Sequence, residues 1–350
     1  MRPLAMFLLL ACSSSGADSR DATVDIATDA AHDEDAAYEE DAAEPFDPIA
    51  PLEDAHRCVE DVASFSIAWD DLANPIWTVP DRALKDVSVR HSEGTWHFYY
   101  SDIRDDPFRF RAGYATSVDL RSFTELAGWD DGDGVGGVAS PDITRHADGY
   151  IAVYNSHTRD GDGFPKLYRR AAPSLGELSS APPTRILADN YDTLANRLID
   201  SALAHTTEGL VLAFKHFQRF EIALAPSGSL GGPWTLLGAP DTEPLENYQF
   251  FQLDGAWHLL GTNIPAHDPV LFRRGDDWLS WTEVRTFDVP EEAWNTEERA
   301  NAAFLCDARD ADGFFYLFYA GSTELDRYEG RGHAKIGIAR SPDLTTWEVP

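Results

Sequence analysis

Basic residues are scarce in this 350-residue sequence: 28 Lys and Arg residues stand against 60 Asp and Glu residues, and the formal net charge is −32. Such an acidic surface repels nucleic acid and anionic membranes, so the composition argues against a polyanion-binding role. Neutral ligands such as sugars remain compatible with it. The hydrophobic content of 43% is enough to bury a large core, in one large all-β domain or in two ordinary ones.

Cysteine is also scarce, and the first of the three cysteines follows a short apolar run at the N-terminus. That run is too short to span a bilayer as a mature helix and is typical of an export signal. Leu9-Leu10-Ala11-Cys12 resembles the bacterial lipobox, in which the cysteine is acylated. We therefore expect a lipoprotein signal peptide at residues 1–11 and an exported lipoprotein anchored through Cys12 at the outer membrane or cell surface. The alternative is an ordinary signal peptide with an incidental cysteine.

Large apolar side chains are few in the next stretch, residues 12–57. Between residues 13 and 55, about fourteen carboxylates face the single Arg20, so there is almost nothing to bury. This composition predicts a disordered acidic tether, extended by its own charge repulsion, that precedes the folded domain. A calcium-binding tail is the weaker alternative.

The two remaining cysteines, Cys58 and Cys306, lie near the start and near the end of the folded domain. In an exported chain they are candidates for a disulfide, and two buried free thiols are the alternative.

Five segments from residue 58 onward share one plan: an acidic residue in or near a short strand, a turn containing glycine, and then an apolar strand. The first four acidic anchors are 56, 58 and 46 residues apart (142−86, 200−142, 246−200). This period fits four-stranded blades, so residues 58–350 are predicted to form an all-β, five-bladed β-propeller. A β-sandwich or two smaller β domains are the alternatives. The strip 65–69 could close the ring by pairing with the last blade.

Residues at the starts of the inner strands of a propeller converge at one mouth of its channel. Four carboxylates are expected there, and glycoside cleavage needs two carboxyl groups with separated pKa values. The ends of the second strands return to the same mouth, and they carry polar side chains suited to hydroxyl groups. The carboxylates are Asp86, Asp142, Asp200 and Glu246; the further candidate sugar-binding residues are Asn155, His157, Lys215, His216, Asn263 and, as a stacking face, Tyr248.

The anchors also carry a family resemblance over residues 60–350. They are similar to the blade starts of the five-bladed propeller glycosidases of glycoside hydrolase family 43 and of relatives such as family 62. The matching motifs are Lys85-Asp86-Val87, Ser140-Pro141-Asp142-Ile143, Ile199-Asp200-Ser201, Glu246-Asn247-Tyr248 and Leu253-Asp254-Gly255.

The resemblance implies that Asp86 is the general base, Glu246 the general acid and Asp200 the residue that tunes the acid. It further implies an arabinofuranosidase-like or xylosidase-like reaction with inversion, the two working carboxyls being roughly 6.5–9.5 Å apart. It also places His333 over the central channel; an exposed loop histidine is the alternative. Val87, Ser201 and Asn247-Tyr248 stand where the family usually has Pro or Gly-Pro, so other sugars and phosphorolysis stay open.

Two other function classes fit the same pattern: a carbohydrate-binding propeller that has lost catalysis, and a structural scaffold whose acids are paired to Arg or Lys. The expected partner is carbohydrate, without nucleic acid, and the chain is expected to be a monomer. No cofactor and no catalytic metal are predicted. A structural calcium ion near residues 129–134 is left open, although the spacing there does not match an EF-hand loop.

Overall fold

The computed structural model describes residues 55–105, 108–130, 137–146, 149–157, 165–191, 196–264, 266–324 and 334–350. All of them lie in one compact unit, Pro45–Pro350. Cys12, the predicted signal peptide and nearly all of the predicted tether lie outside the described residues, so they stay predictions. In the described ranges, no helix is long and apolar enough to cross a bilayer.

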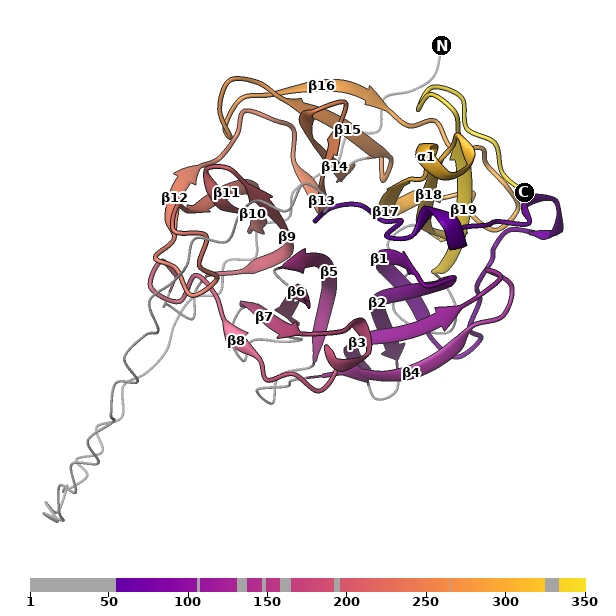
Figure 1. Cartoon of the computed structure of the whole chain (residues 1–350), viewed down its shortest axis with the longest axis horizontal. Coiled ribbons are helices and arrows are strands. Elements are labelled where there is room, and N and C mark those ends of the chain that lie inside the picture. Colours follow the sequence, from indigo (N-terminus) through magenta and orange to yellow (C-terminus); the bar gives the residue numbers. More distant parts are fainter. Residues whose placement is uncertain are drawn as a thin grey trace, which may run out of the picture. The chain divides into compact units, whose positions relative to one another are not determined.

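Five antiparallel sheets surround a central axis, which confirms the predicted five-bladed β-propeller (Figure 1). Each sheet is a blade, with its first strand innermost. The inner strands are β1 (Ala83–Ser92), β5 (Val138–His146), β9 (Leu198–Thr206), β13 (Leu245–Leu253) and β17 (Glu298–Asp307). Moving outward, blade 1 adds β2 (Thr95–Asp105), β3 (Phe108–Ser117) and β4 (Thr124–Trp129); blade 2 adds β6 (Gly149–Ser156), β7 (Leu167–Ala172) and β8 (Thr184–Arg185); blade 3 adds β10 (Gly209–His216), β11 (Arg219–Ala225) and β12 (Thr235–Gly238); blade 4 adds β14 (Ala256–Asn263), β15 (Pro269–Arg274) and β16 (Trp281–Thr286); blade 5 adds β18 (Phe315–Ser322) and β19 (Lys335–Ser341).

Predicted glycine turns join inner strands to second strands in blades 1, 3 and 4. In blades 1 and 4 the turn is Glu93-Gly94 or Asp254-Gly255, with positive φ at both residues, as a two-residue hairpin with the twist of a β-sheet requires. In blade 5 the short helix α1 (Arg309–Asp312) takes this place. We call this side of the propeller the hairpin end and the side where the inner strands begin the start end.

The apolar core is divided among the blade interfaces. Five clusters of buried side chains each join two neighbouring blades, for example Leu203 of β9 with Ile151 and Val153 of β6. Each inner strand is covered on both faces by neighbouring blades, so nearly all of its residues are buried. In β9, all nine residues are buried.

Both ends of the domain close the ring by binding to the outer edge of β19. The Trp77 and Ile336 backbones exchange hydrogen bonds of 3.1 and 3.0 Å, and Glu348 pairs with Arg340 in the same way at 2.9 and 3.0 Å. Between them, the Asn74 side chain donates to the Ile338 carbonyl at 2.8 Å and accepts from its N–H at 2.9 Å. The expectation that residues 65–69 make this pairing is therefore wrong.

The strip 65–69 packs instead of pairing. Phe65 contacts Trp96 edge-on, with ring centroids 5.5 Å apart, and a 3-10 turn begins at Trp69. A strand cannot continue through that turn. The residues that pair with β19, including Trp77, therefore follow the turn in the chain.

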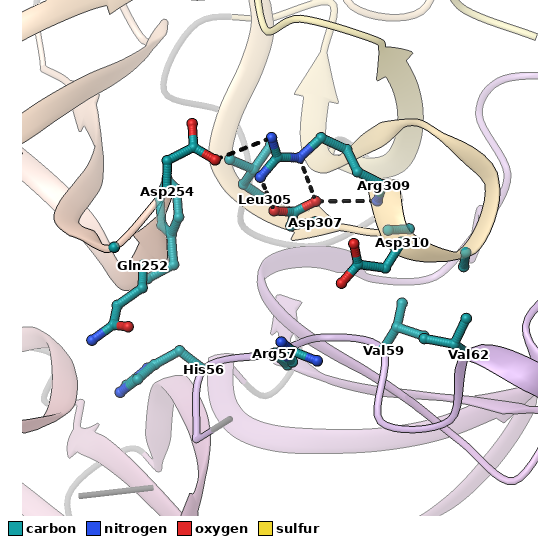
Figure 2. Close-up of a pocket in the computed structure, with 14 residues that line it drawn as sticks. His56, Arg57, Val59, Val62, Gln252, Asp254, Leu305, Asp307, Arg309 and Asp310 are labelled. Carbon is teal, nitrogen blue, oxygen red and sulfur yellow. Dashed lines mark hydrogen bonds and ion pairs between the residues drawn. The ribbon is translucent and has the colours of Figure 1, made fainter. Parts of the chain in front are cut away.

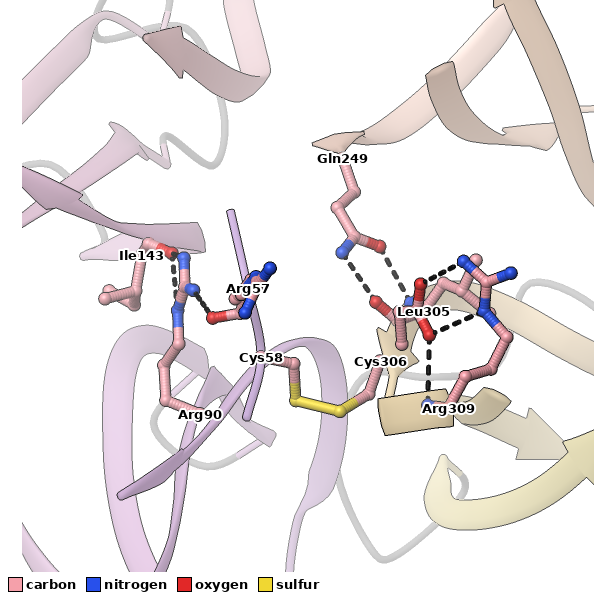
Figure 3. The surroundings of a disulfide bond; sticks show 9 residues. Arg57, Cys58, Arg90, Ile143, Gln249, Leu305, Cys306 and Arg309 are labelled. Carbon is pink, nitrogen blue, oxygen red and sulfur yellow. Dashed lines mark hydrogen bonds and ion pairs between the residues drawn. A yellow bond between two sulfur atoms is a disulfide. The ribbon is translucent and has the colours of Figure 1, made fainter. Parts of the chain in front are cut away.

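At the hairpin end, Cys58 and Cys306 form a disulfide with their Cα atoms 5.2 Å apart, which links the domain's first segment to β17 (Figure 3). The buried Arg90 guanidinium donates to the carbonyls of Arg57 and Ile143, and to that of Ala55 at 3.1 Å. Residues 55–58 are thereby fixed to inner strands of blades 1, 2 and 5.

Candidate active site

One residue in each inner strand has a left-handed backbone, close to the start end of the strand. The five residues and their φ values are Asp86 (55°), Ser140 (53°), Asp200 (53°), Asn247 (55°) and Ala302 (50°). At each of them the pairing with the second strand is interrupted by a bulge. Such strained positions in non-glycine residues persist where the surrounding structure holds them, and they often mark functional sites.

This alignment corrects the predicted equivalence of the four carboxylates. Asp86 and Asp200 share the bulged position, whereas Glu246 lies one residue before it and Asp142 two residues after it. The bulged position is filled by Ser140 in blade 2 and by Asn247 in blade 4.

A repeated hydrogen bond between blades holds this strained backbone. A side chain on the second strand of one blade accepts from the N–H of the bulged residue in the next blade. The three pairs are Ser101 Oγ with Ser140 N (2.9 Å), Asn155 Oδ1 with Asp200 N (3.1 Å) and Thr262 Oγ1 with Ala302 N (3.0 Å). The predicted site residue Asn155 therefore positions the backbone of Asp200.

Blade 3 has Lys215 in the corresponding place, and an ammonium group cannot accept a hydrogen bond. Its Nζ instead donates to Glu246 Oε2 at 2.7 Å. Both side chains are largely buried, with 5% of Lys215 and 18% of Glu246 exposed. The repeated structural hydrogen bond is thus replaced by an ion pair at the predicted general acid.

The Asp86 carboxylate is surrounded by donors from three blades. Oδ2 accepts from Ser101 Oγ at 2.6 Å and from Ser140 Oγ at 3.2 Å, and Oδ1 accepts from Asn247 Nδ2 at 2.8 Å. Lys85 Nζ lies 3.6 Å from Oδ1. These contacts fix the orientation of the carboxylate.

Asp200 is bound to the same hydroxyl, since Ser140 Oγ lies 2.8 Å from Asp200 Oδ1. Burial, followed by repulsion from Glu246 and Asp86, raises the pKa of Asp200 to about 6. Burial also raises the pKa of Glu246, but Lys85 and Lys215 outweigh it and hold that pKa below its ordinary value. The site therefore contains carboxyl groups with separated pKa values, and in the free protein Asp200 retains its proton to higher pH than Glu246.

Asp142 belongs to a second layer of hydrogen bonds between blades. Its Oδ2 accepts from the Leu203 N–H at 3.1 Å, just as Ser88 Oγ accepts from Ile143 N in blade 2 at 3.1 Å. Burial raises the pKa of Asp142 to about 6, against the lowering effect of the Leu203 N–H and of Arg90. Asp86, Asp142 and Asp200 all line a small channel cavity of about 30 Å³.

The other predicted sugar-binding residues lie at the start end, with different surroundings. His157 packs on Phe110 with ring centroids 3.7 Å apart, and burial, Arg197 and Lys85 lower its pKa to about 4. The Asn263 side chain accepts from the Ala266 N–H at 3.4 Å. His333 lies outside the described residues.

Two of the predicted residues have their polar atoms engaged elsewhere. The His216 ring is bound by Glu221 and Asn196, both at 3.1 Å, on the side of blade 3 away from Lys215. Tyr248 donates to the Leu245 carbonyl at 2.7 Å and stacks on Phe220 with centroids 4.7 Å apart, so it is part of the core.

Sequence reasoning missed Ser140 and Asn247, which bind Asp86. A signal for both exists in the hairpin spacing. The bulged residue precedes the turn glycine by 8 or 9 residues in four blades (94−86, 149−140, 209−200, 255−247). Counting back from the glycine, and not searching for acids, finds the residues that face the channel.

A larger cavity of about 240 Å³ lies at the hairpin end, away from these carboxylates (Figure 2). One wall is an ion-pair chain, in which Arg309 bonds to Asp307 at 2.8 Å and approaches Asp254 at 3.5 Å. The single Arg309 is thus shared between two carboxylates in this wall. In the described part of the chain, no group of three or more His, Cys, Asp or Glu side chains could hold a metal ion, and residues 131–136 of the candidate calcium loop lie outside it.

No protein-family model matches this chain, and no curated protein sequence matches it. Solved structures of glycoside hydrolases share its fold. A thermostable family-43 glycoside hydrolase has a TM-score of 0.54 at 14% identity, over 79% of this chain and 95% of that one. A family-43 β-xylosidase/α-arabinofuranosidase from a compost microbial metagenome, in complex with xylotriose, has a TM-score of 0.56 at 15% identity, over 78% and 96%.

The catalytic domain of the Coprinopsis cinerea family-62 α-L-arabinofuranosidase has a TM-score of 0.56 at 13% identity, over 75% of this chain and 92% of that one. The predicted resemblance to family-43 and family-62 propellers is confirmed at the level of the fold.

Proposed function

We propose that this protein is a glycoside hydrolase that acts on a polysaccharide or oligosaccharide at the cell surface. The observation that carries the proposal is the joined set of carboxyl groups at the start end: Ser140 bridges Asp86 and Asp200, and Glu246 acts electrostatically on Asp200. The fold shared with solved glycosidases supports the same reaction class.

In this proposal Asp86 activates the attacking water, Glu246 protonates the departing sugar oxygen, and Asp200 governs the proton supply of Glu246. The three donors on Asp86 hold its carboxylate in one orientation while water is deprotonated. Since Lys215 favours the ionised form of Glu246, the acid step needs a proton to reach Glu246 in the substrate complex, and the raised pKa of Asp200 keeps one nearby.

The proposed substrates are arabinofuranosides and xylosides, and the proposed stereochemistry is inversion. Structural neighbours support this choice of sugar, since one of them is a β-xylosidase/α-arabinofuranosidase solved with xylotriose. Export and a lipid anchor at Cys12 would bring such an enzyme to extracellular polysaccharide.

The Lys215–Glu246 ion pair favours a second candidate, a non-catalytic carbohydrate-binding propeller. A carboxylate that stays paired to a buried ammonium 2.7 Å away is a poor proton donor. In this function the same hydroxyl, amide and carboxylate groups would bind sugar hydroxyls without cleaving a bond.

Hydrolysis of a panel of aryl glycosides and polysaccharides by the full chain distinguishes the glycoside hydrolase from the carbohydrate-binding propeller. Turnover that is lost in both Asp86→Asn and Glu246→Gln supports the glycosidase. Absence of turnover on every member, with one polysaccharide still bound equally by all three proteins, supports the binding module.

A further inference from the structure

Three successive blades bring their bulged residues side by side at the channel. Asp86 of blade 1 and Asp200 of blade 3 are both carboxylic acids, and Ser140 of blade 2 lies between them. All three residues line the channel cavity. Because blade 2 separates the two acids, its bulged residue is the side chain that is placed to connect them.

The position of Ser140 is fixed by its backbone. Its φ of 53° lies in the left-handed region, and its N–H donates to Ser101 Oγ at 2.9 Å. Only 9% of Ser140 is exposed. A buried serine with a strained backbone has few alternative positions, so its hydroxyl stays between the two carboxyl groups.

Ser140 Oγ is within hydrogen-bond distance of both acids, 3.2 Å from Asp86 Oδ2 and 2.8 Å from Asp200 Oδ1. A serine hydroxyl has a single hydrogen, and an ionised carboxylate can only accept. With both acids ionised, Ser140 would donate to one of them, and its oxygen would face the other acid without a hydrogen between them. Both contacts are hydrogen bonds only when one of the two carboxyl groups carries a proton and donates it to Ser140.

That proton belongs to Asp200 in the free protein. Asp86 already accepts hydrogen bonds on both of its oxygens, from Ser101 Oγ at 2.6 Å and from Asn247 Nδ2 at 2.8 Å. Burial, followed by repulsion from the neighbouring acids, raises the pKa of Asp200 to about 6. Below this pH the chain of hydrogen bonds therefore runs from Asp200 through Ser140 to Asp86.

A proton has to move in the opposite direction after each turnover. In the proposed function Asp86 takes a proton from water, Glu246 gives one to the departing sugar oxygen, and Asp200 resupplies Glu246. Asp86 is then left with one proton too many and Asp200 with one too few. Only 9% of the Asp86 side chain is exposed, so exchange of this proton with bulk water is restricted.

We propose that Ser140 returns this proton from Asp86 to Asp200. The O–H bond on Asp86 Oδ2 breaks as the proton binds to Ser140 Oγ, and the hydrogen that Ser140 carried passes to Asp200 Oδ1. Ser140 is unchanged, Asp86 is again ionised and Asp200 is again protonated, so no proton is gained or lost. The inference rests on the proposed function, and it makes Ser140 a positioning residue that acts through the two acids.

The first test does not need turnover. In the unaltered chain, the carbon-13 NMR signal of the Asp86 carboxyl should shift as Asp200 titrates near pH 6, because the hydrogen of Ser140 turns between the two acids. Ser140→Ala should reduce this shift at Asp86 by about half or more. Asn247→Ala is the matched control, since it removes a hydrogen bond to Asp86 and leaves the bridge to Asp200 in place. An equal shift at Asp86 in Ser140→Ala and in the unaltered chain would overturn the inference.

The second test measures hydrolysis of an aryl glycoside that the unaltered chain cleaves, with increasing imidazole in the buffer. Ser140→Ala should lower kcat about tenfold with little change in KM, and imidazole should restore part of kcat by carrying the proton away from Asp86. Asn247→Ala should lose activity that imidazole does not restore.

An unchanged kcat in Ser140→Ala, or a response to imidazole no different from that of Asn247→Ala, would overturn the inference. If no protein hydrolyses any glycoside while the shift at Asp86 still depends on Ser140, the hydrolase proposal fails and the proton exchange between the two acids stands.

Discussion

At the scale of single residues, Lys215 departs from the pattern repeated in the other blades and contacts the predicted general acid. In three other blades the matching position accepts a backbone hydrogen bond, whereas Lys215 donates to Glu246 at 2.7 Å. Lys85, Lys215 and His267 all lower the pKa of Glu246, against the effect of burial. The ionisation of the predicted acid is therefore set by side chains from several separate segments of the chain.

Replacing Lys215 by Met should raise the pKa of Glu246, because the carboxyl stays buried and loses its closest cation. The pKa is read from the carbon-13 NMR titration of the Glu246 carboxyl. Lys215→Arg keeps the charge and is the control. A Glu246 pKa that is the same in all three proteins would show that Lys215 does not set its ionisation.

Asp142 should make the folded protein less stable as pH rises. Its pKa is about 6 in the folded protein and 3.8 ordinarily, so the folded state binds more protons between these values. The folded state is most stable with respect to this carboxyl below about pH 4, where Asp142 is protonated. As the pH rises through about 6, Asp142 ionises and the free energy of unfolding falls, by up to roughly 3 kcal/mol. Asp142→Asn keeps an acceptor for the Leu203 N–H without the buried charge.

We therefore expect Asp142→Asn to have a smaller decrease in the free energy of unfolding between pH 4 and pH 7 than the unaltered chain. Denaturant unfolding at several pH values measures this difference. Parallel pH profiles for the two proteins would contradict the buried, titrating carboxyl.

At the scale of strands and turns, the bulges define the site. The hairpins were predictable because Glu93-Gly94 and Asp254-Gly255 are turn sequences with a known backbone preference. The bulges were not, since Ser140 and Asn247 adopt positive φ without being glycines. Their strain is offset by contacts between blades, which a local sequence pattern does not contain. For the same reason the sequence pattern treated the four acids as equivalent, although Glu246 and Asp142 lie beside the bulged position and not at it.

The hydrogen bonds between blades should contribute measurably to stability. Thr262→Val keeps the shape of the buried side chain but leaves the Ala302 N–H without its acceptor at 3.0 Å. The expected loss is about 1–3 kcal/mol in the free energy of unfolding, measured with denaturant. Thr262→Ser retains the hydroxyl and should recover most of the loss. If Val and Ser variants unfold at the same denaturant concentration, the hydrogen bond contributes nothing.

At the scale of the whole molecule, the two ends of the propeller differ in the residues that they carry. The start end carries the carboxylates, and the hairpin end is closed by residues 55–58, which Arg90 and the disulfide fix in place. The disulfide joins positions that are 248 residues apart and so closes nearly the whole domain. The sequence indicated the disulfide through the predicted export signal, but the closure of β19 by Trp77 and Glu348 depends on three-dimensional proximity alone.

Removal of both cysteines, as Cys58→Ser with Cys306→Ser, should lower the stability of the domain by about 2–5 kcal/mol. Thermal unfolding of the variant, compared with the unaltered chain under oxidising and reducing conditions, measures the effect. The variant should behave like the reduced chain. Carbohydrate binding at low temperature should be retained, because the bond lies at the end opposite the carboxylates. A variant as stable as the oxidised chain would show that the bond does not hold the closure.

The central claim is that the joined carboxyl groups at the start end hydrolyse a glycosidic bond. The most direct measurement is proton NMR of the sugar released from arabinoxylan or an aryl arabinofuranoside, followed from the first turnovers in the unaltered chain and in Asp86→Asn. The account predicts a product of inverted anomeric configuration that forms only when Asp86 is present. Release that continues undiminished in Asp86→Asn, or no release from any glycoside to which the chain binds, would contradict it.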